Sequence, residues 1–146
     1  MNTILPKACH VVVCMLVACV PASVIASDWS TVGQQGKTKL ALDVESLELN
    51  VPAGVGKVWA RTQFNPPSKF GDKKVAKLMD HYEVDCDTQK YAVLRSIAYD
   101  GAGEVVGSSD VPQQMQPTVP DTTAAVVVNA VCAVLSARKA ANPSAR

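Results

Sequence analysis

Two cysteines, Cys86 and Cys132, lie in the body of this chain, 46 positions apart, and they constrain its fold more than any other feature. The other three cysteines fall within the first 26 residues, which have the character of a secretory signal. An exported domain with an even number of thiols usually pairs them in a disulfide. A bridge over this separation would stabilise the folded state by about 4 kcal/mol in the chain-entropy model.

A metal site and a catalytic nucleophile are the alternatives for these cysteines. A metal site needs three or four clustered ligands, and His81 is the one histidine that follows the signal segment. A nucleophile needs a base, but His81 lies five residues before Cys86, so within one strand the two would face opposite sides. The disulfide is the preferred interpretation, and the other two stay open here.

Residues 1–26 show the order of a signal peptide: a charge at Lys7, an apolar run, and small residues before an expected cleavage after Ala26. The apolar run is shorter than the roughly 20 residues that span a bilayer. A second signal overlaps the first, because LVAC, ending at Cys19, fits the box at which bacterial lipoproteins are cut and acylated. The preferred interpretation is export as a soluble protein. The alternative is lipidation of Cys19, and this lipid would be the sole membrane attachment.

Alternating apolar residues predict antiparallel strands over most of the exported chain. A glycine-containing turn at 100–103 joins two of them in a hairpin. Residues 27–37 are expected to be loop, as is 65–73, where prolines and a glycine interrupt the pattern. The expected strands cover 38–44, 57–64, 73–86, 89–99 and 104–109, and 45–50 is expected to continue the first of them after a kink, with Leu47 and Leu49 inward.

After residue 120 the apolar period becomes helical. Asp121 is the expected N-cap, and Cys132 lies on an apolar stripe, so the helix would carry its sulfur toward the sheet. We therefore predict an α+β domain, residues 27–139, with a single antiparallel β-sheet of about five or six strands packed by one C-terminal helix and one disulfide. Residues 140–146 are predicted to be a flexible tail.

The chain lacks recognisable catalytic, phosphate-binding or metal-binding motifs. Asp80, Asp85 and Asp87 fit solvated strand-edge charges better than a catalytic pair. Without Lys7, 13 basic residues balance 13 acidic ones, and a neutral chain argues against a nucleic-acid partner. We predict no enzyme activity, no metal and no cofactor; a small hydrolase using His81 and a nearby carboxylate is the minor alternative.

One charged cluster is the candidate for partner binding. Lysines that protect an edge strand from unwanted pairing are the simpler explanation for it. The alternative is a contact surface for an acidic or protein partner, because clustered lysines attract anions even on a neutral chain. The cluster comprises Lys69, Phe70, Lys73, Lys74 and Lys77.

Five segments in order resemble the surface-adhesin protein E family of bacterial envelope proteins: DWSTVG, LDVESLE, KVWART, VDCDTQKYAVLRSIAYDGAGEVV and PDTTAAVVVNAVC. The resemblance runs from about Asp28 to Cys132. It implies a sheet packed by a C-terminal helix, with Cys86 and Cys132 matching the family's two cysteines. It also implies an adhesin that binds host extracellular-matrix or serum proteins and pairs as a homodimer, with its contact region at about 66–86.

From the residues and the resemblance together we expect an exported, non-enzymatic bacterial envelope protein, in the periplasm or at the outer-membrane and cell surface. The leading hypothesis is a protein-binding, adhesive module. The alternative is a periplasmic structural or assembly protein with no host ligand.

Overall fold

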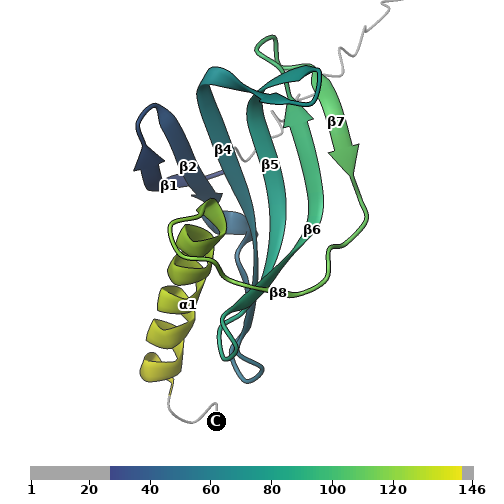
Figure 1. Cartoon of the computed structure of the whole chain (residues 1–146). Coiled ribbons are helices and arrows are strands. Elements are labelled where there is room, and N and C mark those ends of the chain that lie inside the picture. The colour runs from purple at the N-terminus through teal and green to yellow at the C-terminus, as the bar shows by residue number, and fades with distance from the viewer. Residues whose placement is uncertain (1–26, 143–146) are drawn as a thin grey trace, which may run out of the picture.

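The computed structural model describes residues 27–142; the predicted signal peptide and Cys19 lie outside this part. Within it, an antiparallel sheet carries one long helix on one face (Figure 1). The main strand order is β1-β2-β4-β5-β6-β7, while β3 pairs with β4 and β8 with β6. The elements are β1 Trp29–Gln35, β2 Thr38–Asp43, a 3-10 turn Val44–Ser46, β3 Glu48–Asn50, β4 Val55–Phe70, β5 Lys73–Asp85, β6 Lys90–Tyr99, β7 Val105–Ser109, β8 Gln116–Pro117 and α1 Thr123–Ala141.

The predicted α+β architecture is confirmed, with more strands than expected. The sheet has eight strands in the described residues. The expected continuation through 45–50 is the 3-10 turn followed by the short separate strand β3, and Leu47 and Leu49 pack against the core as expected. Strand β8 has only two residues, too short for any alternation to appear in the sequence. The hairpin predicted around residues 100–103 is present as β6 and β7.

The N-terminal loop prediction was wrong, because residues 29–35 form the edge strand β1. This strand pairs in antiparallel register with β2, from Trp29 opposite Asp43 to Gln35 opposite Thr38. All of its side chains are half-buried or exposed. An edge strand of this kind lacks the apolar alternation from which strands are predicted.

The loop expected at 65–73 is also largely strand, because β4 continues to Phe70 and β5 begins at Lys73. The register of the two strands shifts between Gln63 and Ser68, so Pro66 and Pro67 fall where the ladder is interrupted and no proline N–H is needed. The two-residue turn that follows has Gly71 at φ +64°, a conformation that favours glycine.

The hydrophobic core lies between α1 and one face of the sheet, which we call the helix face. On β2, β4 and β5, residues of even number such as Ala60 and Tyr82 alternate into it as predicted. Asp43, Thr62 and Asp80 are the buried polar residues of the described chain. The core cluster consists of Leu40, Leu42, Val58, Ala60, Tyr82, Val84, Ala124, Val127, Val128 and Val131.

The helix begins one residue later than predicted. Thr122 is the N-cap, and its hydroxyl accepts a hydrogen bond from the N–H of Ala125 at 3.2 Å. Asp121 instead has φ +58°, outside the helix. By length and composition α1 alone among the described helices could span a membrane, but its buried side packs on the sheet, as in the core helix of a folded domain.

The predicted disulfide joins Cys86, directly after β5, to Cys132 in the middle of α1, with an S–S distance of 2.04 Å and a Cα–Cα distance of 5.4 Å. The bond therefore attaches the helix to the sheet that it covers. Because each sulfur is bonded to the other, neither cysteine serves as a free nucleophile or as a thiolate ligand here.

Candidate binding surface

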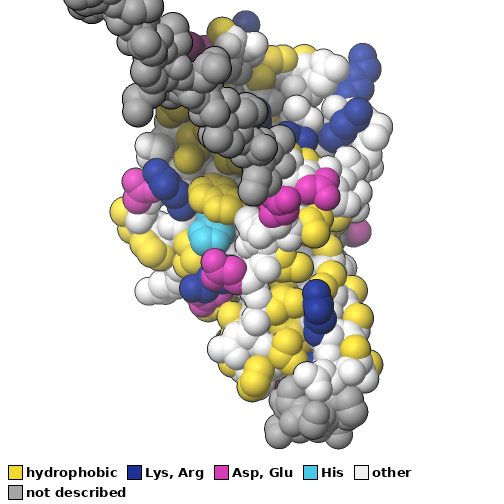
Figure 2. Space-filling model, turned by 180° about the vertical axis from the view of Figure 1, so that it is seen from behind, with side chains coloured by type: hydrophobic (Ala, Val, Ile, Leu, Met, Phe, Trp, Pro, Cys, Tyr) yellow, Lys and Arg dark blue, Asp and Glu magenta, His cyan; other side chains and the backbone are white. Residues whose placement is uncertain are grey.

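The sheet face opposite α1, which we call the open face, carries polar and aromatic side chains together (Figure 2). The rings of Trp59 and His81 stack with centroids 4.9 Å apart. The Arg61 guanidinium lies 4.4 Å from the centre of the Trp29 ring. Through these contacts the side chains of Trp59, Arg61 and His81 are half-buried, although they lie on the face that α1 leaves uncovered.

His81 lacks the geometry of a catalytic base. Burial lowers its pKa below the usual value, and Glu48 and Lys57 act on it with opposite signs. Neutral imidazole therefore dominates at neutral pH. Within the described residues no hydrogen bond joins His81 to a carboxylate or hydroxyl group, and Asp80 points to the opposite face, so the hydrolase hypothesis gains no support.

Asp80 is buried, which corrects its interpretation as a solvated strand-edge charge. It lies on the helix face between Ala60 and Ser96 of the neighbouring strands. The Ser96 hydroxyl donates a hydrogen bond of 2.6 Å to its carboxylate. Burial raises the pKa of Asp80, and the hydrogen bond from Ser96 offsets part of this effect.

Replacing Asp80 with asparagine is expected to stabilise the protein at neutral pH. Because its pKa is raised on folding, the folded state holds the proton more tightly, and stability falls as the pH rises from the ordinary carboxyl range through the raised pKa. Urea unfolding from about pH 3 to pH 8 measures the free energy of unfolding of the parent and of Asp80→Asn. The difference between these two free energies should grow as the pH rises. A difference that is constant over this range would contradict the assignment.

Asp85 and Asp87 have structural contacts at the β5–β6 turn. One oxygen of Asp85 accepts from the N–H groups of Asp87 and Thr88, and the other accepts from the Thr88 hydroxyl. These hydrogen bonds lower the pKa of Asp85, and the two from Thr88 have the largest effect. Asp87 forms an ion pair of 3.5 Å with Lys139 of α1.

Residues 64–76 of the β4–β5 hairpin, which we call the hairpin tip, extend beyond both neighbouring strands. The pairing of β4 with β2 ends at Gln63, and the pairing of β5 with β6 ends at Lys77. Four predicted contact residues lie on the tip: Lys69, Phe70, Lys73 and Lys74. Figure 1 shows this hairpin at one end of the sheet, curving toward β6 and β7.

The four predicted contact residues of the tip lie on two opposite faces, two on each. Lys69 lies directly opposite Lys74, and Phe70 opposite Lys73. The Lys73 ammonium group donates a hydrogen bond to the backbone carbonyl of Val106 in β7. Phe70 remains 49% exposed and packs its ring against Phe64 at a centroid distance of 5.8 Å.

Lys77 lies apart from the tip and belongs to a row of side chains that the sequence did not reveal. Lys39, Gln63, Lys77 and Tyr99 face one another in four adjacent strands. The Lys77 ammonium group lies 3.9 Å from the centre of the Tyr99 ring. Strand pairing alone brings these residues together, because Lys39 and Lys77 are separated by 38 positions in the sequence (77 minus 39).

The fold and this surface define a small sheet-and-helix module held by one disulfide, with a basic hairpin at one end. The family model of surface-adhesin protein E matches residues 29–133, and the chain belongs to this family. A comparison with curated protein sequences finds no match. Membership of this family supports an exported or envelope location and an adhesin-like module in general terms.

Solved structures of Haemophilus influenzae protein E are similar to this chain. One has a TM-score of 0.50 and 14% sequence identity, and the alignment covers 81% of this chain and 93% of that one. A second crystal form gives a TM-score of 0.48 and 15% identity, covering 66% and 82%. At this identity the likeness concerns the fold.

Proposed function

We propose that this protein is an exported, non-enzymatic binding module that holds a protein partner through the hairpin tip. The observation that carries the proposal is the pair Lys69 and Lys74, exposed and directly opposite each other beyond the edges of the neighbouring strands. Like charges in this position destabilise a hairpin by roughly 0.2–1 kcal/mol. An acidic partner surface relieves this repulsion on binding.

The other contacts of the tip support the same role. Phe70 offers an exposed aromatic ring beside the charges, and aromatic residues are common anchors at protein interfaces. The hydrogen bond from Lys73 to the carbonyl of Val106 fixes the tip against β7, so less freedom is lost when a partner binds. Membership of a surface-adhesin family supports host extracellular-matrix or serum proteins as partners.

The variant Lys69→Ala/Lys74→Ala is expected to bind immobilised laminin or vitronectin about tenfold more weakly than the parent, through the loss of two charge contacts. Replacing Lys73 in addition should reduce binding further, because its hydrogen bond to the carbonyl of Val106 fixes the tip. Solid-phase binding at physiological ionic strength measures both effects. Lys37→Ala/Lys39→Ala is the control, because it removes the same charge from β2 and the turn before it.

No binding by the parent to either protein would overturn the host-adhesion proposal. Cell fractionation and protease treatment of intact cells distinguish an adhesin from the alternative, a periplasmic structural protein. An adhesin must be cleaved from outside, whereas a periplasmic structural protein is protected. The homodimer stays a prediction. Sedimentation of the purified protein, which measures its mass in solution, tests it.

A further inference from the structure

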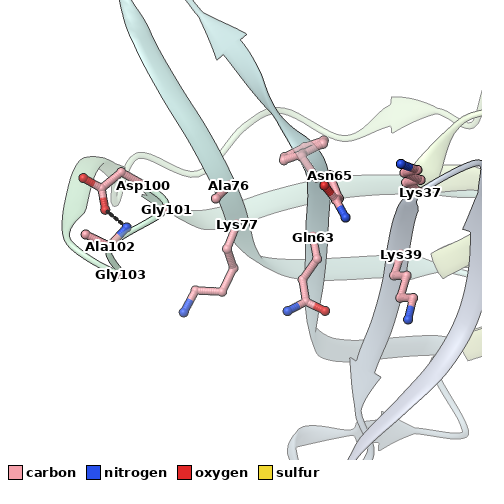
Figure 3. A pocket seen from close by; sticks show the side chains of 11 residues that line it. Lys37, Lys39, Gln63, Asn65, Ala76, Lys77, Asp100, Gly101, Ala102 and Gly103 are labelled. Carbon is pink, nitrogen blue, oxygen red and sulfur yellow. Dashed lines mark hydrogen bonds between the residues drawn. The ribbon is translucent and has the colours of Figure 1, made fainter.

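A cavity of about 520 Å³ lies at the end of the sheet where β2, β4 and β5 meet the β6–β7 turn (Figure 3). Its volume is in the range of small-ligand sites. We infer that it binds an anionic oligosaccharide, a sulfated or carboxylated sugar chain. This role goes beyond the protein binding proposed for the hairpin tip. The groups that we assign to it are Lys37, Lys39, Lys77, Gln63 and Asn65.

Three of these side chains are arranged by strand register. Lys39 is opposite Gln63, which is opposite Lys77, and the three extend in the same direction in Figure 3. Adjacent strands are about 4.8 Å apart, so the two lysines start about 10 Å from each other with an amide between them. This spacing is of the order of one disaccharide unit, which suits a chain with repeating charges.

The cavity has a surplus of positive charge. Its three lysines face one lining carboxylate, Asp100. One oxygen of that carboxylate accepts from the N–H groups of Ala102 and Glu104, each at 2.9 Å, and this holds Asp100 within the turn. Among the described residues none of the three lysines forms an ion pair, so their charges are available to an anion.

The strand context favours a sugar over a peptide. β4 and β5 are inner strands here, since Gln63 is paired on both sides and Lys77 pairs with Gln63 and Tyr99. At Gln63 and Lys77 the backbone groups are therefore used, and an extended peptide cannot join the sheet there as an additional strand. Recognition must come from side chains. The amides of Gln63 and Asn65 both donate and accept hydrogen bonds, which matches sugar hydroxyl groups.

The test uses a size-defined heparin tetrasaccharide and the mature chain with its disulfide intact. Isothermal titration at low ionic strength should show binding that weakens as salt is added, because exposed charges are screened. Lys37→Ala/Lys39→Ala should lower the affinity about five- to tenfold. The matched variant Lys69→Ala/Lys74→Ala removes the same charge from the hairpin tip and should stay within about twofold of the parent. Cooperative unfolding at melting temperatures no lower than that of the parent confirms that both variants fold.

Three results would overturn the inference. The first is that the parent does not bind the tetrasaccharide at low ionic strength. The second is that the two variants lose affinity equally, which would indicate non-specific charge attraction. In the third, a polyglutamate peptide of equal charge binds as tightly as the sugar, which assigns the cavity to acidic peptides. The proposed protein binding fails separately, because it depends on Lys69 and Lys74 rather than on Lys37 and Lys39.

Discussion

Replacing Cys86 and Cys132 together with alanine is expected to lower the free energy of unfolding by about 4 kcal/mol. The bridge closes a loop with a sequence separation of 46 and joins α1 to the end of β5. Without it the unfolded chain gains conformational freedom, while the helix keeps its packing contacts and the exposed ion pair between Lys139 and Asp87. Since small domains have a total stability of about 5–15 kcal/mol, this is a large share. Urea unfolding followed by far-ultraviolet circular dichroism measures the loss.

Reduction of the parent is the matched control for this substitution. With a thiol reductant present, the parent should become about as unstable as the alanine variant, and the variant itself should not change. Equal stability of the oxidised parent and the variant would contradict the expected effect. Labelling of both thiols in the native protein, prepared without reductant, would contradict the disulfide itself.

Substituting Gly56 with alanine should destabilise the protein by about 1–3 kcal/mol through overpacking. A Cβ atom at this position would lie 2.5 Å from Cγ1 of Val131 and 3.1 Å from Cδ2 of Leu49. Val131 is 1% exposed, and as a β-branched residue in a helix it has one strongly preferred rotamer. The valine therefore cannot turn away, and the helix must shift from the sheet. Thermal and urea unfolding report the change.

A double-mutant cycle separates close packing from other effects of Gly56. Val131→Ala alone leaves space in the core and should destabilise by about 2 kcal/mol. In the double variant the new methyl group of residue 56 occupies part of that space, so the combined loss should be smaller than the sum by at least about 0.5 kcal/mol. Gly101→Ala is the control, since a Cβ there meets nothing within 4 Å. Simple additivity would contradict close approach as the cause.

The elements predicted correctly are those in which one side of the backbone is buried. Val58 and Ala60 in β4 alternate with half-buried neighbours, and the period of two is visible in the sequence. The helix was equally clear, because Val128, Val131 and Leu135 recur at its three- and four-residue spacing and are all buried. The disulfide followed from the number of cysteines and the expected export.

The missed elements depend on contacts between distant parts of the chain. Strand β1 is held by its pairing with β2 rather than by burial, so its sequence resembles a loop. The extension of β4 past Pro66 and Pro67 depends on a shift in register, which no local pattern indicates. Burial of Asp80 likewise requires the position of Ser96 in the next strand, which supplies its hydrogen bond.

The candidate site was only partly predictable for the same reason. Lys69, Phe70, Lys73 and Lys74 are close in the sequence, and the hairpin keeps them close. Lys77 was grouped with them by sequence distance, whereas the sheet places it beside Gln63, which separates it from Lys39. Side chains that meet through strand register are found only when the pairing of the strands is known.

The stability and binding of Lys69→Glu, measured on the same protein preparation, test the proposed role of the hairpin tip most directly. The substitution places opposite charges at positions 69 and 74, which should stabilise the hairpin by roughly 0.2–1 kcal/mol. It should also weaken binding to immobilised laminin or vitronectin by at least about tenfold, because an acidic partner now meets a carboxylate. We predict that stability rises while binding falls. Undiminished binding in this variant would contradict a contact surface at the tip.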